Sequence, residues 1–540
     1  MRRLAAAVLL ACALVAAPAH ASMQQESTFQ DDDLLVFGSA DTQAKTLDEL
    51  KSLGVDRIRA SLFWNSVAPD PKSKTKPSGF DASDPAAYPA DNWAKYDRLI
   101  TGAQARGIAI NLDPTGPAPL WATGKPDRAD IEGWYQPSPD EFGAFVAAAA
   151  KRYSGSYTPP PPPQPAPPPS NNNGGGGVPI PPPPARAAQS GGSGALPRVD
   201  YWAIWNEPNQ SGWLAPQWVQ AGGRWNEAAP SLYRGLVDAA YSALQANGHG
   251  GDTILVGETA PKGLVTLRGE TRSIDALRFL RALYCVSSKY KPLTGDAATR
   301  IGCPADPSGF AAAHPGLFSA TGWAHHPYEL LAKPQQVPKH RDWVTIANLP
   351  HLTGALNAVL RAYGKSRTGG LPLYLTEYGY QTNPPDKFGV SFNQQAAYLD
   401  ESEFITYTNP NVRTLSQFLL HDGGGDVGVT FQSGLETNDG TRKPSYQAYA
   451  LPVYLPKRSF RRTQRLRVWG LARPAPNGSA QKVAVQFKAR RGTKWRTVRT
   501  LKTVGTGYVD GRVKMPGTGS VRLQWGSLTS RTVSVARRRR

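Results

Sequence analysis

Two short segments place a glutamate directly after a strongly apolar run. The first, WAIWNEPN at 202–209, contains Glu207, and the second, LYLTEYG at 373–379, contains Glu377. Burying a carboxylate costs free energy unless it is paired or performs chemistry. Two carboxylates that face each other across one site can act as proton donor and nucleophile toward a glycosidic bond. The two glutamates are therefore the candidate catalytic pair.

Other polar side chains follow apolar segments in the same way. Arg59, Asp113, Glu258 and the adjacent His325 and His326 each stand near the end of such a segment. For Glu258 a structural salt bridge is favoured over a catalytic role. The two histidines could be core residues or metal ligands, but no acid lies nearby at a matching spacing. We therefore expect no metal site and no cofactor.

Residues 33–452 alternate segments of strand length with helical patterns. The segments with the length and apolar content of strands are LLVFGS (34–39), VDRIRASLFW (55–64), GIAINLDPTG (107–116), VDYWAIWNEP (199–208), TILVGETAP (253–261), TGWAHHPY (321–328), LPLYLTEYGY (371–380) and VRTLSQFLLHD (412–422). Strands that alternate with helices in this number predict an α/β fold, the (β/α)8 or TIM barrel, whose strand ends meet at one mouth. A doubly wound open sheet is the alternative, but no glycine-rich phosphate loop follows any of these strands.

Residues 158–196 interrupt this region with a low-complexity segment rich in proline and glycine. Proline removes backbone hydrogen-bond donors and glycine resists ordering, so we expect the segment to be disordered. It falls between a helical pattern, DEFGAFVAAAAKRYSG, and the strand that precedes Glu207. That position lies at the end of the barrel opposite the predicted mouth, and it predicts a surface excursion that can be deleted.

The motifs WNEPN and LTEYG, whose glutamates are 170 residues apart, resemble those of the large clan of retaining glycoside hydrolases with (β/α)8 barrels. Within that clan the chain is most similar to the β-xylosidase-like family 39 and the cellulase-type family 5. The resemblance covers residues 33–452. It implies that Glu207 is the general acid/base, that Asn206 binds the sugar 2-hydroxyl and that Glu377 is the nucleophile.

The same resemblance implies roles for further residues at the predicted mouth. Arg59 would keep the nucleophile ionised, and His326 and Tyr328 would border the cleaved sugar. Trp64, at a strand end, and Trp213, after strand four, are further candidates for substrate contact, because flat rings offer apolar surfaces to the C–H faces of sugars. The chain departs from the clan at strand eight, where QFLLHDGG carries no tryptophan.

The C-terminal segment 457–540 differs in composition from the rest of the chain. It contains 23 Lys and Arg and a single acid, a charge of +22, so that the net charge of +20 leaves −2 for all other residues. Short strand patterns separated by glycine turns predict a small all-β sandwich. We expect this module to bind anionic cell-wall polymers and to take no part in bond cleavage; a merely basic spacer is the alternative. Nucleic acid is not expected as a partner, because the basic residues follow no recognition motif.

Residues 1–21 have the features of a secretory signal, namely Arg2 and Arg3, an apolar run and an Ala-His-Ala cleavage site. We therefore expect a secreted protein, which the basic module could hold at the cell wall. No other apolar run is long enough to span a membrane.

Two cysteines remain after removal of the signal, Cys285 and Cys303, and they predict one disulfide in preference to a catalytic thiol or a zinc site.

Together these features predict a secreted retaining glycoside hydrolase that cleaves a poly- or oligosaccharide by double displacement. The alternative is a non-catalytic protein that keeps the barrel as a scaffold and binds glycans or the cell wall. The presence of both Glu207 and Glu377 favours the enzyme. Xylan, mannan, glucan and arabinoside substrates are all compatible with the pattern.

Overall fold

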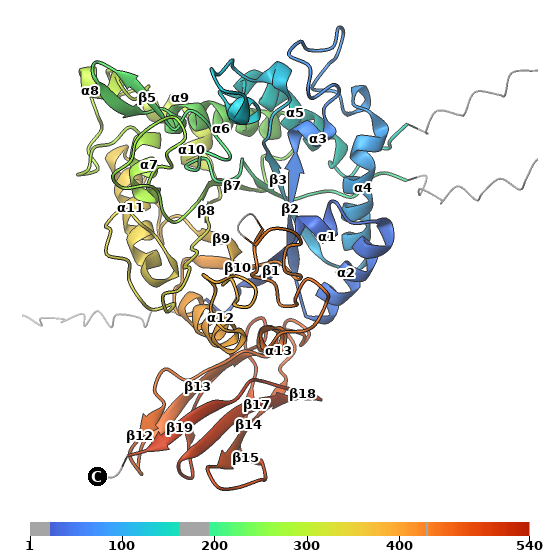
Figure 1. The fold of residues 1–540 in the computed structure, drawn as a ribbon, viewed down its shortest axis with the longest axis vertical. Coiled ribbons are helices and arrows are strands. Elements are labelled where there is room, and N and C mark those ends of the chain that lie inside the picture. The colour runs from blue at the N-terminus through green and yellow to red at the C-terminus, as the bar shows by residue number, and fades with distance from the viewer. Residues whose placement is uncertain (1–21, 161–193, 428–429, 539–540) are drawn as a thin grey trace, which may run out of the picture.

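The computed structural model describes residues 22–160, 194–427 and 430–538. Within them a barrel carries a smaller all-β domain on one side (Figure 1). The predicted signal peptide, most of the predicted disordered insert and the last two arginines lie outside the described residues. Among the helices that are described, none is long and apolar enough to cross a membrane.

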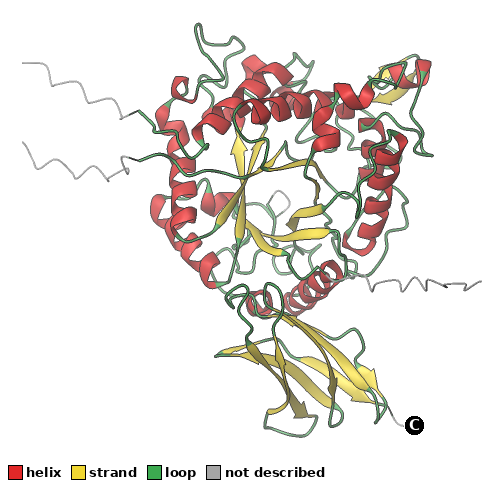
Figure 2. Cartoon of the chain, turned by 180° about the vertical axis from the view of Figure 1, so that it is seen from behind, coloured by secondary structure: helices red, strands yellow, loops and turns green. Residues whose placement is uncertain are grey.

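Parallel strands close into a barrel in the order β1-β2-β3-β4-β7-β8-β9-β10, and β10 pairs back with β1. They are β1 (Glu26–Gln30), β2 (Arg57–Phe63), β3 (Ala109–Thr115), β4 (Tyr201–Ala203), β7 (Thr253–Thr259), β8 (Gly322–His325), β9 (Leu373–Tyr378) and β10 (Val412–Phe418). The predicted (β/α)8 barrel is confirmed, and the pairing of β1 with β10 excludes an open sheet. Figure 2 shows the strands inside a ring of helices.

The first barrel strand is not the predicted one. LLVFGS is expected to be a strand, but β1 lies upstream at Glu26–Gln30, and Asp32–Leu35 forms the short helix α1. That prediction is wrong because hydropathy is misleading at both places. The strand has the polar sequence ESTFQ, whose Gln30 is buried and accepts a hydrogen bond from Arg59. The apolar LLV follows Asp31, whose carboxylate caps the N-terminus of α1.

Helices cover the outside of the barrel, and their apolar faces join the strands in one large core. The longer ones are α2 (Ala40–Ser52), α4 (Ala90–Ala105), α5 (Pro139–Arg152), α6 (Ala229–Ala246), α7 (Ala276–Leu283), α11 (Leu349–Ala362), α12 (Phe392–Tyr407) and α13 (Pro444–Ala450). The shorter ones are α3 (Trp64–Val67), α8 (Gly295–Thr299), α9 (Phe310–Ala313) and α10 (Pro315–Ser319). A hairpin of β5 (Trp218–Ala221) and β6 (Arg224–Glu227) follows β4.

The segment that contains the insert joins α5 to β4, at the N-terminal end of the barrel strands. The described residues on its two sides meet, because the backbone N–H of Leu196 donates to the carbonyl oxygen of Tyr157 at 2.8 Å. The side chain of Arg198 also donates to the carbonyl oxygen of Ser154 at 3.3 Å. The chain therefore leaves the barrel and re-enters it at one place.

The C-terminal domain consists of two sheets, β11-β13-β16 and β12-β19-β17-β14-β15, with β18 beside β17. Its strands are β11 (Val453–Tyr454), β12 (Ser459–Phe460), β13 (Arg465–Leu471), β14 (Lys482–Ala489), β15 (Arg496–Lys502), β16 (Tyr508–Lys514), β17 (Gly519–Trp525), β18 (Leu528–Thr529) and β19 (Val533–Arg537). Alternate side chains such as Val485 and Leu523 are buried in a core of their own, separate from that of the barrel. The predicted all-β sandwich is confirmed.

The sandwich is joined to the barrel by a buried interface on α12 and α13, the helices that lie between the two in Figure 1. Trp469 of β13 is fully buried and packs against Phe404 and Tyr407 of α12. Arg473 forms a buried ion pair with Glu403 of the same helix. A chain cut between the two parts would expose these aromatic rings to water, so the sandwich is an integral part of the fold.

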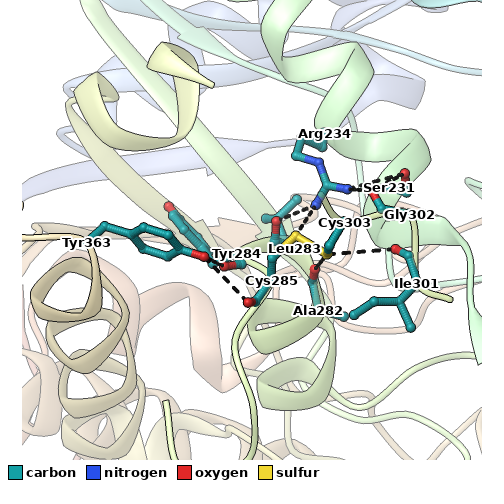
Figure 3. Close-up of a disulfide and its surroundings, with 10 residues drawn as sticks. All are labelled: Ser231, Arg234, Ala282, Leu283, Tyr284, Cys285, Ile301, Gly302, Cys303 and Tyr363. Carbon is teal, nitrogen blue, oxygen red and sulfur yellow. Dashed lines mark hydrogen bonds between the residues drawn. A yellow bond between two sulfur atoms is a disulfide. The ribbon is translucent and has the colours of Figure 1, made fainter. Parts of the chain in front are cut away.

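Cys285 and Cys303 form the predicted disulfide, close to the C-terminal end of α7 (Figure 3). Arg234 of α6 lies beside it and donates to the carbonyl oxygen of Leu283 at 2.8 Å and to Sγ of Cys285 at 3.2 Å. Burial lowers the pKa of Arg234 to about 10. The bridge links the residue after α7 to the segment after α8 (Gly295–Thr299), and Arg234 connects it to α6. Neither cysteine lines the cavity at the mouth.

Candidate active site

The two candidate carboxylates lie together at the C-terminal ends of the barrel strands. Glu207 follows β4, and Glu377 lies near the end of β9. One oxygen of Glu207, one oxygen of Glu377 and a ring nitrogen of His326 all lie within 4.8 Å of one another. Retaining glycosidases place their carboxyl groups ~5–5.5 Å apart, whereas inverting enzymes separate them by ~6.5–9.5 Å. The closest oxygens of the two glutamates therefore face each other across one site.

A tight backbone turn directs Glu207 into the mouth. Trp205 and Glu207 have positive φ values of 65° and 37°, which residues other than glycine seldom adopt. Neighbouring strands hold this turn in place. The backbone N–H of Glu207 donates to the carbonyl oxygen of Glu258 at 3.0 Å, and that of Trp205 to Pro114 at 3.1 Å. Strained backbone that the surrounding fold enforces is typical of functional sites.

Arg59 of β2 is the centre of the polar network. Its Nη1 donates to Oε1 of Glu377 at 2.8 Å, and its Nη2 donates to Oδ2 of Asp113 at 2.7 Å. Nη2 also donates to Oδ1 of Asn206 at 2.8 Å, which leaves the amide nitrogen of Asn206 to donate to a ligand. The ion pairs offset the cost of burying the guanidinium. Arg59 therefore fixes both the nucleophile candidate and the residue beside Glu207.

His326 lies between three carboxylates. Its Nδ1 is 2.9 Å from Oε1 of Glu207, and its Nε2 is 2.7 Å from Oε2 of Glu258. Burial alone would lower the pKa of His326, but the charge of Glu377 and the hydrogen bonds to Glu207 and Glu258 raise it to about 10. A protonated imidazole donates from both nitrogens and has no lone pair for a metal ion. In this state His326 donates to Glu207 and Glu258 and holds both carboxylates in place.

His325 and Glu258 have supporting positions. Burial lowers the pKa of His325 to about 3, and its Nε2 lies 3.1 Å from the carbonyl oxygen of Val344, so it is a neutral core residue. Glu258 forms the expected salt bridge, to Arg59 at 3.2 Å. Burial raises the pKa of Glu258, but Arg59 and His326 outweigh it, so the net shift is downward. Ionised Glu258 thus stabilises the charge of His326.

Glu377 is held from both sides. Arg59 donates to its Oε1, and the hydroxyl of Tyr328 donates to its Oε2 at 3.1 Å. Burial raises the pKa of Glu377, and the charges of His326 and then Arg59 oppose this rise without cancelling it. The sequence predicts that Arg59 keeps this carboxylate ionised. In the structure His326 lowers the pKa of Glu377 more than Arg59 does, and the net shift of this pKa is upward.

A cavity of about 440 Å³ opens over these groups, a size typical of small-molecule sites. Its walls include Asn206, Glu207, Tyr328 and Glu377, so the structure brings these predicted residues together. Arg59 and His326 are fully buried behind these residues. Arg59 contacts the cavity residue Glu377, and His326 contacts the cavity residue Glu207.

The two predicted tryptophans differ in position. Trp213 lines the cavity, as expected for a substrate contact. Trp64 does not, because its side chain is completely buried and stacks on Phe145 of α5 at a ring-centroid distance of 5.7 Å. The strand-end position of Trp64 is the one expected, but the ring turns outward into the layer between strands and helices. It is therefore a core residue and is not available to a ligand.

Several cavity residues are missing from the sequence-based prediction. Gln30 and Asp32 stand at the end of β1 and were missed because that strand was not recognised. Phe418, the last residue of β10, and Phe431 provide aromatic surface at strand eight, where the expected tryptophan is absent. The QF pair within the predicted strand eight, 412–422, is the signal that could have identified Phe418.

Comparison of the sequence with protein-family models and with curated proteins finds no match. Among solved structures, a family 39 glycoside hydrolase from the gut symbiont Bacteroides cellulosilyticus WH2 is similar with a TM-score of 0.46 and 13% identity, over 92% of this chain and 79% of that one. The GH39 enzyme from Xanthomonas axonopodis pv. citri is similar with a TM-score of 0.45 and 15% identity, over 93% and 94% of the two chains.

A third similar structure is that of GH5_18 from Streptomyces cattleya in complex with GlcNAc, with a TM-score of 0.42 and 14% identity over 79% of each chain. These neighbours belong to the two families that the motifs resemble. Their scores and identities are too low to support a functional conclusion, so the function is inferred from the site itself.

Proposed function

We propose that the protein is a glycoside hydrolase that cleaves O-glycosidic bonds of a carbohydrate and retains the configuration at the anomeric carbon. The main support is the approach of carboxylate oxygens of Glu207 and Glu377 to within 4.8 Å at the mouth of the barrel. Inversion requires room for a water molecule between the sugar and the basic carboxylate. The close approach of these two oxygens supports double displacement instead.

In the first step the carboxylate of Glu377 attacks the anomeric carbon while the carboxyl group of Glu207 donates its proton to the departing oxygen. The products are a glycosyl ester on Glu377 and a free alcohol. In the second step water attacks the same carbon, Glu207 takes up a proton from it, and Glu377 leaves as a carboxylate. Arg59 and Tyr328 donate to the two oxygens of Glu377 and orient them toward the sugar.

The first prediction concerns stereochemistry and the nucleophile. Proton NMR of the first-formed sugar, after a screen of aryl glycosides and polysaccharides, should show retention. Glu377→Ala should lower kcat on the order of 10⁴-fold or more, because the covalent intermediate can no longer form. The matched control is Asp48→Ala, at an exposed carboxylate on the outer helix α2, which should keep the wild-type kcat.

Two results would contradict this proposal. An inverted first product would exclude double displacement, and full activity of Glu377→Ala would exclude the assigned nucleophile. Binding of glycans without hydrolysis of any of them would instead favour the non-catalytic scaffold.

We also propose that the protein is exported and that its basic sandwich, residues 457–540, holds it at an anionic surface such as a cell-wall polymer. The signal-like residues 1–21 support export. The strand register supports the second part, because Arg465 lies opposite Lys514 in the pairing of β13 with β16, and Arg512 lies on the same face. The Arg467 opposite it is already paired with Asp510. Like charges directly opposite each other on a sheet repel, and a bound polyanion would relieve that repulsion.

A further inference from the structure

Exposed apolar side chains gather on one face of the molecule. Among the described residues eleven Leu, Val and Phe side chains are exposed, and ten of them lie in loops that follow barrel strands. Examples are Phe37 after β1, Leu264 after β7, Leu330 after β8, Phe388 after β9 and Phe431 after β10. Single exposed apolar residues are normal anywhere on a surface, but their confinement to one face indicates a binding surface.

This apolar rim is continuous with the candidate active site. Leu330, 59% exposed, and Phe431, 48% exposed, both line the cavity. Phe431 packs edge-on against Phe418 at 5.4 Å between ring centroids, and Phe418 packs against Tyr328 at 6.2 Å. Tyr328 in turn donates to Glu377. Apolar surface therefore runs without a break from the nucleophile candidate to the rim.

The chemistry of the rim differs from that of a sugar subsite. Sugars are recognised by flat aromatic faces and by hydrogen-bonding groups placed around their hydroxyls. Leu330 offers neither, and it has further exposed aliphatic neighbours on the same loop, Leu331 and Val337. The cavity also carries polar side chains, among them Asn206 and Glu377 and the ion-paired Lys262 and Glu329, so it can hold a sugar beside an apolar group.

We infer that the substrate is an amphipathic glycoside whose sugar lies at Glu207 and Glu377 and whose apolar aglycone, an alkyl chain, lies against Leu330 and Phe431. This inference rests on the proposed glycosidase function and names its substrate class. The bond that breaks joins the anomeric carbon to the aglycone oxygen, and that oxygen receives the proton of Glu207. The apolar alcohol then leaves at the rim. Each methylene group removed from water strengthens binding about fourfold, so kcat/KM should rise with chain length.

A series of alkyl glycosides, from methyl to octyl, tests the inference. The sugar is the one released fastest from a panel of 4-nitrophenyl glycosides, and all concentrations stay below those at which micelles form. For the wild type, kcat/KM should be at least about tenfold higher for the octyl than for the methyl glycoside. The double variant Leu330→Ser/Phe431→Ser should lower this ratio at least about fivefold. Val504→Ser, at an exposed apolar residue of the sandwich, should keep the wild-type ratio.

The possible failures are distinguishable. An octyl-to-methyl ratio near one, or a ratio that the double variant does not change, overturns the inference and leaves the glycosidase proposal in place. Faster cleavage of unsubstituted oligosaccharides than of the octyl glycoside assigns the rim to further sugar units, and also overturns it. Hydrolysis of polysaccharides with no 4-nitrophenyl glycoside cleaved also overturns the inference alone. If neither kind of substrate is hydrolysed, the glycosidase proposal fails and the inference fails with it.

Discussion

His326 balances the charges of the candidate site. Its Nδ1 lies 2.9 Å from Glu207 and 3.5 Å from Glu377, and its Nε2 lies 2.7 Å from Glu258. With a pKa of about 10 it is a cation at neutral pH. Together with Arg59 it supplies the positive charge that these buried carboxylates need. Its loss would leave buried charges without a partner, which is strongly destabilising.

The pH dependence of stability tests this role. The pKa of His326 is raised from 6.5 to about 10 on folding. Its contribution to stability is therefore fully present below pH 6.5 and is lost as the pH rises through about 10. In urea unfolding, the difference in unfolding free energy between wild type and His326→Gln should be largest in mildly acidic buffer and should shrink as the pH approaches that upper value.

An exposed histidine provides the control for this experiment. His351→Gln, near the start of α11, removes an imidazole without touching the carboxylates. A difference between wild type and His326→Gln that stays constant across the pH range would show that the imidazolium is not formed in the folded protein.

At the scale of elements, the barrel separates connections that carry chemistry from connections that only link. The connections after β4 and β8 place Glu207 and Tyr328 in the cavity. The connection before β4 holds the insert and leaves the barrel where Leu196 pairs with Tyr157. Because the two kinds of connection lie at opposite ends of the strands, a change in one should not disturb the other.

Deletion of the insert tests this separation. Removal of residues 161–193, with a short Gly-Ser link that lets Leu196 keep its bond to Tyr157, should leave kcat within about twofold of wild type. The melting temperature should not fall. As a control, shortening the loop after β7 by removing 265–271, at the mouth, should lower kcat/KM. A large loss of kcat in the insert deletion, with unchanged circular dichroism, would show that the insert takes part in catalysis.

At the scale of the whole molecule, charge and packing place different requirements on the sandwich. Its charge favours the proposed binding of polyanions, whereas Trp469 and Arg473 hold it firmly against α12. Its attachment role must therefore be tested in the full-length chain by changing surface charges, since truncation would damage the barrel as well.

The triple variant Arg465→Gln/Arg512→Gln/Lys514→Gln removes three charges from the β13–β16 face. It should elute from an immobilised poly(glycerol phosphate) column at lower salt than wild type, and it should keep the wild-type kcat on a small soluble glycoside. The binding should weaken with salt, because the Debye length falls from ~10 Å at 0.1 M to ~3 Å at 1 M.

A barrel variant with an equal loss of charge is the matched control. Lys45→Gln/Arg361→Gln/Lys365→Gln changes exposed residues of α2 and of the C-terminal end of α11. If both triple variants elute at the same salt concentration, net charge alone governs retention and the β13–β16 face has no special role.

The local sequence pattern was sufficient to predict most strands of this protein and the two candidate carboxylates. Seven of the eight barrel strands, six strands of the sandwich and both carboxylates could be predicted, because apolar runs that end in polar residues mark strand ends wherever the partners lie. The two-residue strands β11, β12 and β18 were missed, because so short a segment has no pattern of its own. The first strand could not be predicted in the same way. Its polar sequence ESTFQ becomes stable only through partners such as Arg59, which is 29 residues away from Gln30 and bonds to it inside the closed barrel.

Which of two similar residues belongs to the candidate site was decided by the tertiary structure alone. His325 and His326 are neighbours in the chain, yet one is a neutral core residue and the other a cation among carboxylates. Trp213 reaches the cavity, whereas Trp64 is buried behind it. Alternation along a strand dictates that neighbouring side chains point to opposite faces. Which face is the interior depends on strands and helices hundreds of residues apart, and only barrel closure brings these together.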